Sequence, residues 1–119
     1  VTERETRLAT VPVGYADGYA RTLSNRAHML LCGREAPVVG RVCMDQCMLD
    51  VTAIPEAAEG MTVTAFGQDG DAFLPVEEIA ALGGTIHYET ICLIGKRVPR
   101  VFRQNGQIAG RLNYILPER

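Results

Sequence analysis

Short apolar runs separated by glycine-containing turns most constrain the fold of this chain. Seven such runs are present, at residues 8–13, 28–32, 36–42, 46–51, 61–66, 98–102 and 108–114. Asn105-Gly106, between the last two, is the strongest short hairpin signal in the sequence. The strand–helix–strand alternation that builds a parallel sheet is missing. The pattern therefore predicts a mainly β, antiparallel domain that curls into a barrel or sandwich.

Two short helical segments interrupt the β pattern. Residues 75–82 begin with Pro75, which suits the first turn of a helix, and end at a pair of glycines. A second helix is predicted over residues 87–94, with Thr85 as its candidate cap and Gly95 as its stop. Both helices are short enough to be additions to a β domain.

Two further segments have the composition of loops. Residues 54–60 contain a proline and two glutamates, and residues 67–70 read Gly-Gln-Asp-Gly. Glycine, proline and aspartate each favour turns. We therefore expect surface connections at both places.

The composition limits the function. With 119 residues and 13.0 kDa, the chain fits one domain over residues 1–119. A net charge of −2 gives no reason to expect nucleic acid or a membrane surface as a partner. No apolar run approaches the ~20 residues that span a bilayer, and the first residues are charged, so no signal peptide and a cytoplasmic location are expected. The absence of an initiator methionine predicts a piece of a longer protein.

The cysteines do not indicate a disulfide or a metal site. Four are present, and they are Cys32, Cys43, Cys47 and Cys92. No C-x-x-C motif occurs, and the only histidines are His28 and His87. In an extended strand, the four-residue step from Cys43 to Cys47 covers ~13 Å, too far for one bridge or one ion. Buried free thiols in a reducing compartment are therefore expected.

Residues 11–21, V-P-V-G-Y-A-D-G-Y-A-R, form the first cluster of candidate functional groups. They place Tyr15, Asp17, Tyr19 and Arg21 on a loop that leaves a strand, where binding groups are common. The residue types alone favour a simpler interpretation, a tight turn with a capping Asp17 and two partly buried tyrosines. Both interpretations stay open on this stretch alone.

Two more polar clusters follow, G-R-V-C-M-D-Q at residues 40–46 and H-Y-E at residues 87–89. The planar fork of Arg41 suits a carboxylate, although a solvated arginine fits as well. Tyr15 and Tyr88 are candidates for acid–base or anion-binding roles. For any single tyrosine, a half-buried ring with a hydrogen-bonded hydroxyl is the more common case.

Lys96 is the only lysine in the chain. A desolvated lysine can form a Schiff base. Arg97 and Arg100 beside it favour a different role, in which these cations cap the carbonyl end of the preceding helix. No complete catalytic set is visible.

Three stretches together resemble the C-terminal domain of alanine racemase, a pyridoxal-phosphate enzyme of bacterial cell-wall synthesis. They are residues 11–21, residues 36–50 (A-P-V-V-G-R-V-C-M-D-Q-C-M-L-D) and residues 84–102 (G-T-I-H-Y-E-T-I-C-L-I-G-K-R-V-P-R-V-F). Their order and spacing also match, so the resemblance covers nearly the whole chain.

The resemblance implies an architecture larger than this chain. In the family, an N-terminal (β/α) barrel, absent here, holds pyridoxal phosphate on a lysine. A β-rich C-terminal domain completes the site for a small amino acid. The enzyme is a head-to-tail homodimer in which this domain covers the barrel mouth of the other subunit. Partners are thus expected to be the barrels of the same and of a second subunit.

The resemblance also implies positions along a substrate entryway. Tyr15 is similar to the tyrosine that narrows it, and Arg21 and Arg41 are similar to arginines further out. Ile86 lines the same corridor. His87 stands where the family often has asparagine, so the resemblance does not define the polarity of the corridor.

Two residues are implied to act closer to the chemistry. Met44 resembles the residue whose backbone N–H binds the substrate carboxylate, and Tyr88 resembles the inner-gate tyrosine that bonds the cofactor phosphate. The family's two catalytic bases, the cofactor lysine and a tyrosine in S-Y-G, have no counterpart here. The chain alone is therefore predicted to be inactive, because two-base racemisation needs a group on each face of the α-carbon.

Two alternatives remain open. One is a serine-specific racemase domain of the membrane-anchored resistance type. The other is a stand-alone β module that binds a partner or a small anion without catalysis. A domain that covers a partner barrel is expected to expose an apolar patch around Tyr15, Met44 and Tyr88.

Overall fold

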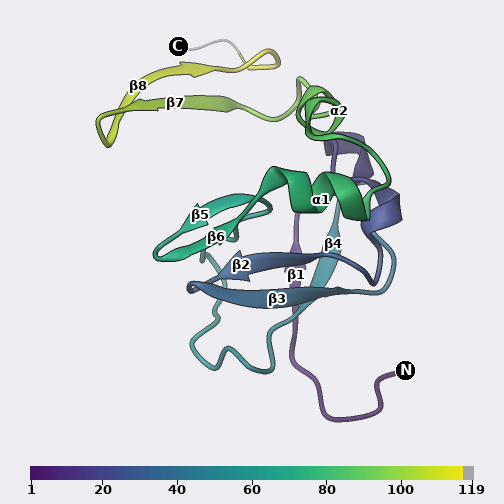
Figure 1. Ribbon diagram of the computed structural model, residues 1–119. Helices are drawn as coiled ribbons and strands as arrows, with labels where there is room; N and C mark the ends of the chain where they lie inside the picture. Colours follow the sequence, from purple (N-terminus) through teal and green to yellow (C-terminus); the bar gives the residue numbers. More distant parts are fainter. Residues whose placement is uncertain (117–119) are drawn as a thin grey trace.

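The computed structural model describes residues 1–116 (Figure 1). In this part of the chain eight strands, two α-helices and two 3₁₀ turns follow one another. Their bounds are β1 (Leu8–Val11), η1 (Tyr15–Asp17), η2 (Arg21–Leu23), β2 (His28–Leu31), β3 (Arg34–Val39), β4 (Cys47–Asp50), β5 (Gly67–Asp69), β6 (Ala72–Leu74), α1 (Val76–Leu82), α2 (His87–Cys92), β7 (Arg100–Gln104) and β8 (Gln107–Leu112).

The main sheet has four antiparallel strands in the order β1-β4-β3-β2. Strands β2 and β3 form the hairpin expected from residues 28–42, and β4 lies between β1 and β3. In β4, Cys47 and Leu49 are buried while the residues that alternate with them are half-buried. That period of two is typical of a strand with one face on the core. The prediction of a mainly antiparallel β domain with two short helices is confirmed.

The core lies between the main sheet and helix α1. Met29, Ala36 and Leu49 have no exposed surface, and Ile79 of α1 is 2% exposed. Burying a side chain of the size of leucine or methionine contributes about 1.5–3 kcal/mol. Helix α1 occurs as predicted but begins one residue later, with Pro75 as its N-cap. Figure 1 shows α1 lying across the main sheet with α2 stacked beyond it.

The last hairpin projects away from this core. Strands β7 and β8 pair with each other through a turn at Asn105-Gly106, whose φ angles of 52° and 76° suit a tight hairpin. Figure 1 shows the pair extending past α2, at a distance from the main sheet. Phe102 and Ile108 are each about half exposed. The hairpin predicted from Asn-Gly is confirmed.

Three local predictions were wrong. Residues 61–66 are β-branched and apolar but form no strand, because their pairing is limited to one bridge between Thr64 and Leu30. Gly67–Asp69, expected as a turn, is strand β5, since it pairs with β6 across a turn at Gly70-Asp71. Helix α2 ends at Cys92, two residues before the predicted end, and its N-cap, for which Thr85 was one candidate, is Ile86. The barrel-like closure of the sheets stays a prediction.

Candidate functional site

The 3₁₀ turn η1 is the centre of the candidate site. Asp17 is 5% exposed, and its Oδ2 accepts a hydrogen bond from the backbone N–H of Gly14 at 3.1 Å. The N–H of Tyr15 donates to the carbonyl oxygen of Cys43 at 3.0 Å, and that of Ala16 donates to Met44 at 2.8 Å. The predicted capping role of Asp17 is confirmed, and the turn places Tyr15 directly against the Met44 loop.

The contact between η1 and the Met44 loop requires glycine at position 14, because no space is left there for a side chain. A Cβ atom at Gly14 would lie 2.2 Å from the carbonyl oxygen of Cys43 and 2.6 Å from the carbonyl carbon of Met44. Any side chain there would push the two backbones apart. The first two polar clusters of the sequence are thus in direct backbone contact.

The connector after helix α2, residues 93–99, meets the same turn from another side. The backbone N–H of Gly95 donates to the carbonyl oxygen of Asp17 at 3.0 Å. The guanidinium of Arg97 donates to Asp17 Oδ1 through Nε at 2.9 Å and also through its terminal Nη2. Helix α2 and the connector after it therefore join η1, although some 80 residues separate them in sequence.

The aromatic and apolar candidates on these segments point outward. Tyr15 is 44% exposed, Met44 59%, Ile86 61% and Tyr88 68%. Exposed apolar side chains indicate a surface that another surface covers when they form one contiguous patch. The ring of His87 lies 4.1 Å from that of Tyr88, centroid to centroid. That Tyr15, Met44 and Tyr88 share one patch stays a prediction.

The two candidate entryway arginines are also exposed. Arg21 opens the turn η2, and Arg41 lies in the loop after β3. Within residues 1–116 neither forms an ion pair. Both guanidinium groups are therefore available to a ligand or a partner surface, as the sequence allowed for Arg41.

The prediction that Lys96, Arg97 and Arg100 cap the carbonyl end of α2 was wrong. The helix ends at Cys92 with Leu93 as its C-cap, and none of the three cations donates to a carbonyl of α2 within the described residues. Arg100 donates to the carbonyl oxygens of Ile94 at 2.8 Å and of Gly95 and Val98 at 2.5 Å. Arg97 instead pairs with Asp17, which the sequence did not indicate. The Nζ of Lys96 lies over the Tyr114 ring, 5.7 Å from its centroid.

The cysteine prediction was wrong for three residues. Cys47 alone is buried, whereas Cys32, Cys43 and Cys92 are exposed. Burial, helped by the charge of a Cys43 thiolate, raises the pKa of the Cys47 thiol to about 11. Burial also raises the pKa of the Tyr19 hydroxyl, which lacks a hydrogen-bond partner within the described chain.

Cys47 should therefore be the last thiol to react with an alkylating reagent. At pH 8, a pKa of about 11 leaves about 100-fold less thiolate than an ordinary cysteine has. The rate of Cys47 alkylation should keep rising about tenfold per pH unit up to about pH 11. Peptide mass spectrometry after timed iodoacetamide labelling measures this order, and early modification of Cys47 would contradict it.

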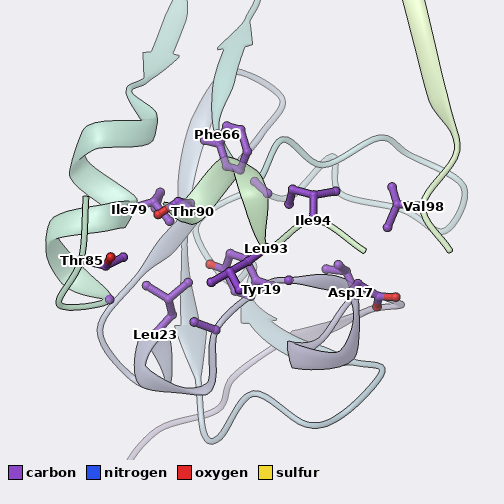
Figure 2. A pocket seen from close by; sticks show the side chains of 15 residues that line it. Asp17, Tyr19, Leu23, Phe66, Ile79, Thr85, Thr90, Leu93, Ile94 and Val98 are labelled. Atoms are coloured by element: carbon purple, nitrogen blue, oxygen red, sulfur yellow. The ribbon is translucent and has the colours of Figure 1, made fainter. Parts of the chain in front are cut away.

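A cavity of about 220 Å³ lies behind the site. Figure 2 shows the side chains that line it, which come from the turns, the segment ending at Phe66, α1 and the segment from α2 onward. They are mostly apolar, and Leu23, Ile79, Leu93 and Ile94 are among them. The cavity thus separates part of α2 and its connector from the core.

The fold and the site define a class of protein: an antiparallel β domain whose candidate residues face outward, as in a domain that completes a site with another surface. Residues 1–102 match the family model of the alanine racemase C-terminal domain. The chain belongs to that family. The recognition made from the three sequence stretches is confirmed.

Curated relatives agree with this assignment. An alanine racemase of Desulfovibrio desulfuricans is 58% identical over 101 residues, which are 85% of this chain and 26% of that protein. Alanine racemase 1 of Clostridium acetobutylicum is 49% identical over 113 residues, or 95% of this chain and 29% of that protein. The chain thus spans less than a third of the length of these relatives.

Solved structures show the same fold. Alanine racemase from Bacillus anthracis with bound L-Ala-P matches with a TM-score of 0.89 and 42% identity, covering 96% of this chain and 29% of that one. Alanine racemase from Bartonella henselae with covalently bound pyridoxal phosphate matches with a TM-score of 0.66 and 31% identity, covering 76% and 25%. In the described chain, every helix is too short or too polar to cross a membrane.

Proposed function

We propose that the protein to which this chain belongs interconverts L- and D-alanine and that this domain supplies residues at the substrate entryway. One observation carries the proposal: η1 fixes Tyr15 against the Met44 loop while both side chains remain exposed. Groups held rigidly at a surface are suited to complete a site that another domain begins. Alanine racemase relatives of this chain support alanine as the substrate.

Met44 is the proposed carboxylate-binding residue. Its carbonyl oxygen accepts a hydrogen bond from Ala16, whereas its N–H has no acceptor within residues 1–116. A free backbone N–H on a rigid turn is a good donor to a carboxylate. Arg41, three residues earlier and exposed, adds positive charge near the path of an amino acid.

Pyridoxal phosphate is the proposed cofactor, and this chain fits only part of its binding. Lys96 is exposed and lies against the Tyr114 ring, which does not suit a desolvated attachment lysine. Tyr88 has an exposed hydroxyl at the start of α2, and we assign it to the cofactor phosphate. When bound, the cofactor acts as the electron sink that acidifies the α-proton of the amino acid.

The proposed partners are a (β/α) barrel of the same polypeptide and a second copy of the protein. Exposed Tyr15, Met44, Ile86 and Tyr88 would be covered by the barrel of the other subunit in a homodimer. A cytoplasmic location follows from the proposed role in making D-alanine for the cell wall.

The tyrosine assignment is tested with the full-length protein by removing one hydroxyl. Tyr88→Phe should lower the affinity for pyridoxal phosphate about 10- to 100-fold, because a hydrogen bond to a charged group is worth about 1.5–3 kcal/mol. Fluorescence titration of the apoprotein measures the affinity, and coupled D-alanine detection measures racemisation.

Tyr114→Phe is the matched control, since Tyr114 is also exposed and its contacts with Lys96 and Arg100 involve the ring. Tyr114→Phe should change neither the affinity for pyridoxal phosphate nor the rate of racemisation by more than about twofold, within the range of ordinary surface substitutions. Equal effects of the two variants would refute the role of Tyr88. Measuring L-serine beside L-alanine tests the serine alternative.

The binding-module alternative is decided by the size of the natural product. An antibody to this chain should detect a polypeptide several times longer in the source cell. A product of 119 residues would favour a stand-alone module instead.

A further inference from the structure

The buried carboxylate of Asp17 connects two parts of the candidate site that are distant in sequence. We propose that Asp17 and Arg97 are a positioning pair that holds helix α2, and with it Tyr88, beside the Tyr15–Met44 face. The kinetic consequence of this inference rests on the proposed racemase function. The pair itself contacts neither substrate nor cofactor in the proposal.

Every oxygen of the Asp17 side chain has a partner. Oδ2 accepts from the Gly14 N–H inside the turn, and Oδ1 accepts from both Nε and Nη2 of Arg97. The Asp17 side chain is 7% exposed and that of Arg97 is 54% exposed. A buried carboxylate that loses its cation becomes strongly unfavourable, so the turn and Arg97 have to stay together.

The connector that carries Arg97 is itself firmly built. Arg100 donates to the carbonyl oxygens of Ile94, Gly95 and Val98. The Gly95 N–H donates back to the Asp17 carbonyl oxygen. The connector follows α2 directly. Fixing Arg97 at η1 therefore also fixes the C-terminal end of α2, the helix whose first turn carries Tyr88.

Apolar packing surrounds α2 only in part. The helix lies on α1, but Thr90 and the two residues Leu93 and Ile94 border the 220 Å³ cavity (Figure 2). Atoms that line a cavity lack contacts on one side and lose that dispersion energy. Ile91 and Leu93 are also half exposed. The ion pair and the backbone bonds therefore add to the packing of α2 on α1 in fixing the position of the helix.

A loosened α2 would displace the Tyr88 hydroxyl. Because a misplacement of about 1 Å costs about 100-fold in rate, a small shift is enough to matter. The sequence alone did not reveal this pair, since Asp17 and Arg97 each had a local explanation as a cap.

The experiment uses the full-length protein with pyridoxal phosphate bound and five variants. They are Asp17→Asn, Arg97→Gln, their double combination, Arg97→Lys and the control Arg103→Gln. Arg103 is exposed and forms no ion pair within the described chain. The readouts are kcat and KM for L-alanine, the affinity for pyridoxal phosphate, and hydrogen exchange of residues 87–94.

Asp17→Asn and Arg97→Gln should each lower kcat/KM about 30-fold and weaken cofactor binding about tenfold, because Tyr88 is displaced. The double variant should also lose about 30-fold rather than the product of about 900-fold, because the two residues act as one unit. Arg97→Lys should recover part of the loss by restoring the charge. Amide exchange in α2 should quicken in the first three variants and stay unchanged in Arg103→Gln.

The positioning role would be overturned by a double variant whose loss in kcat/KM equals the product of the two single losses. Unchanged amide exchange in α2, or equal effects of Arg103→Gln, would also overturn it. If Asp17→Asn fails to fold, Arg97→Gln and Arg97→Lys decide the question, because the Arg97 side chain is half exposed. Wild-type protein without racemisation would contradict the proposed function, and the exchange measurement would still decide whether the pair holds α2.

Discussion

Gly18→Ala is expected to lower the free energy of unfolding by about 3 kcal/mol or more, through backbone strain and overpacking together. Gly18 has a φ of 108°, where residues with a Cβ are strained. A Cβ there would lie 2.4 Å from the carbonyl oxygen of Leu93 and 2.9 Å from the Cα of Ile94. Both contacts are with backbone, which cannot rotate away as a side chain would. Urea unfolding followed by circular dichroism measures the loss.

Gly84→Ala is the matched control for this prediction. Gly84 also has a positive φ, of 77°, but a Cβ there meets no atom within 4 Å. It should cost about 1 kcal/mol, the strain contribution alone. The difference between the variants isolates the contact of η1 with the α2 connector. Equal losses would show that this close approach does not exist.

The 119-residue chain on its own is expected to racemise L-alanine more than about 10⁴-fold more slowly than the full-length protein, even with added pyridoxal phosphate, because general acid–base groups each contribute about 10²–10⁴. Lys96 is exposed against the Tyr114 ring. The candidate residues Tyr15, Met44 and Tyr88 are all exposed on this chain.

Racemisation is measured as D-alanine formation coupled to D-amino acid oxidase, at equal molar concentrations of the chain and the full-length protein. The full-length protein serves as the positive control for cofactor and assay. A rate from the chain within a hundredfold of that control would contradict the prediction. It would also show that the reaction needs no residue beyond these 119.

Local patterns predicted most of the fold. The β2–β3 hairpin, helix α1 after Pro75 and the β7–β8 hairpin at Asn105-Gly106 all occur as expected. Each depends on turn chemistry or periodicity within a few residues, which the sequence contains in full. Residues 61–66 show the limit, because a strand needs a neighbour and only Thr64 finds one.

The candidate site was predictable in its members but not in its arrangement. Tyr15, Met44 and Tyr88 were selected by residue type and family resemblance, and all three are exposed. Their connection through Asp17 was not predictable, because the ion pair joins Asp17 to Arg97 across 80 residues. Local reasoning instead made Arg97 a cap of α2, whereas its guanidinium bonds Asp17.

The sequence by itself determined the fold class, the two hairpins, the first helix and the family, because these follow from neighbouring residues and from uncommon strings of them. Only the tertiary structure decided that η1 joins the Met44 loop to the α2 connector, and that Cys47 alone of the four cysteines is buried. The physical reason is that burial and ion pairing depend on which distant segments meet. A residue type allows such a contact, and the path of the backbone determines which contacts form.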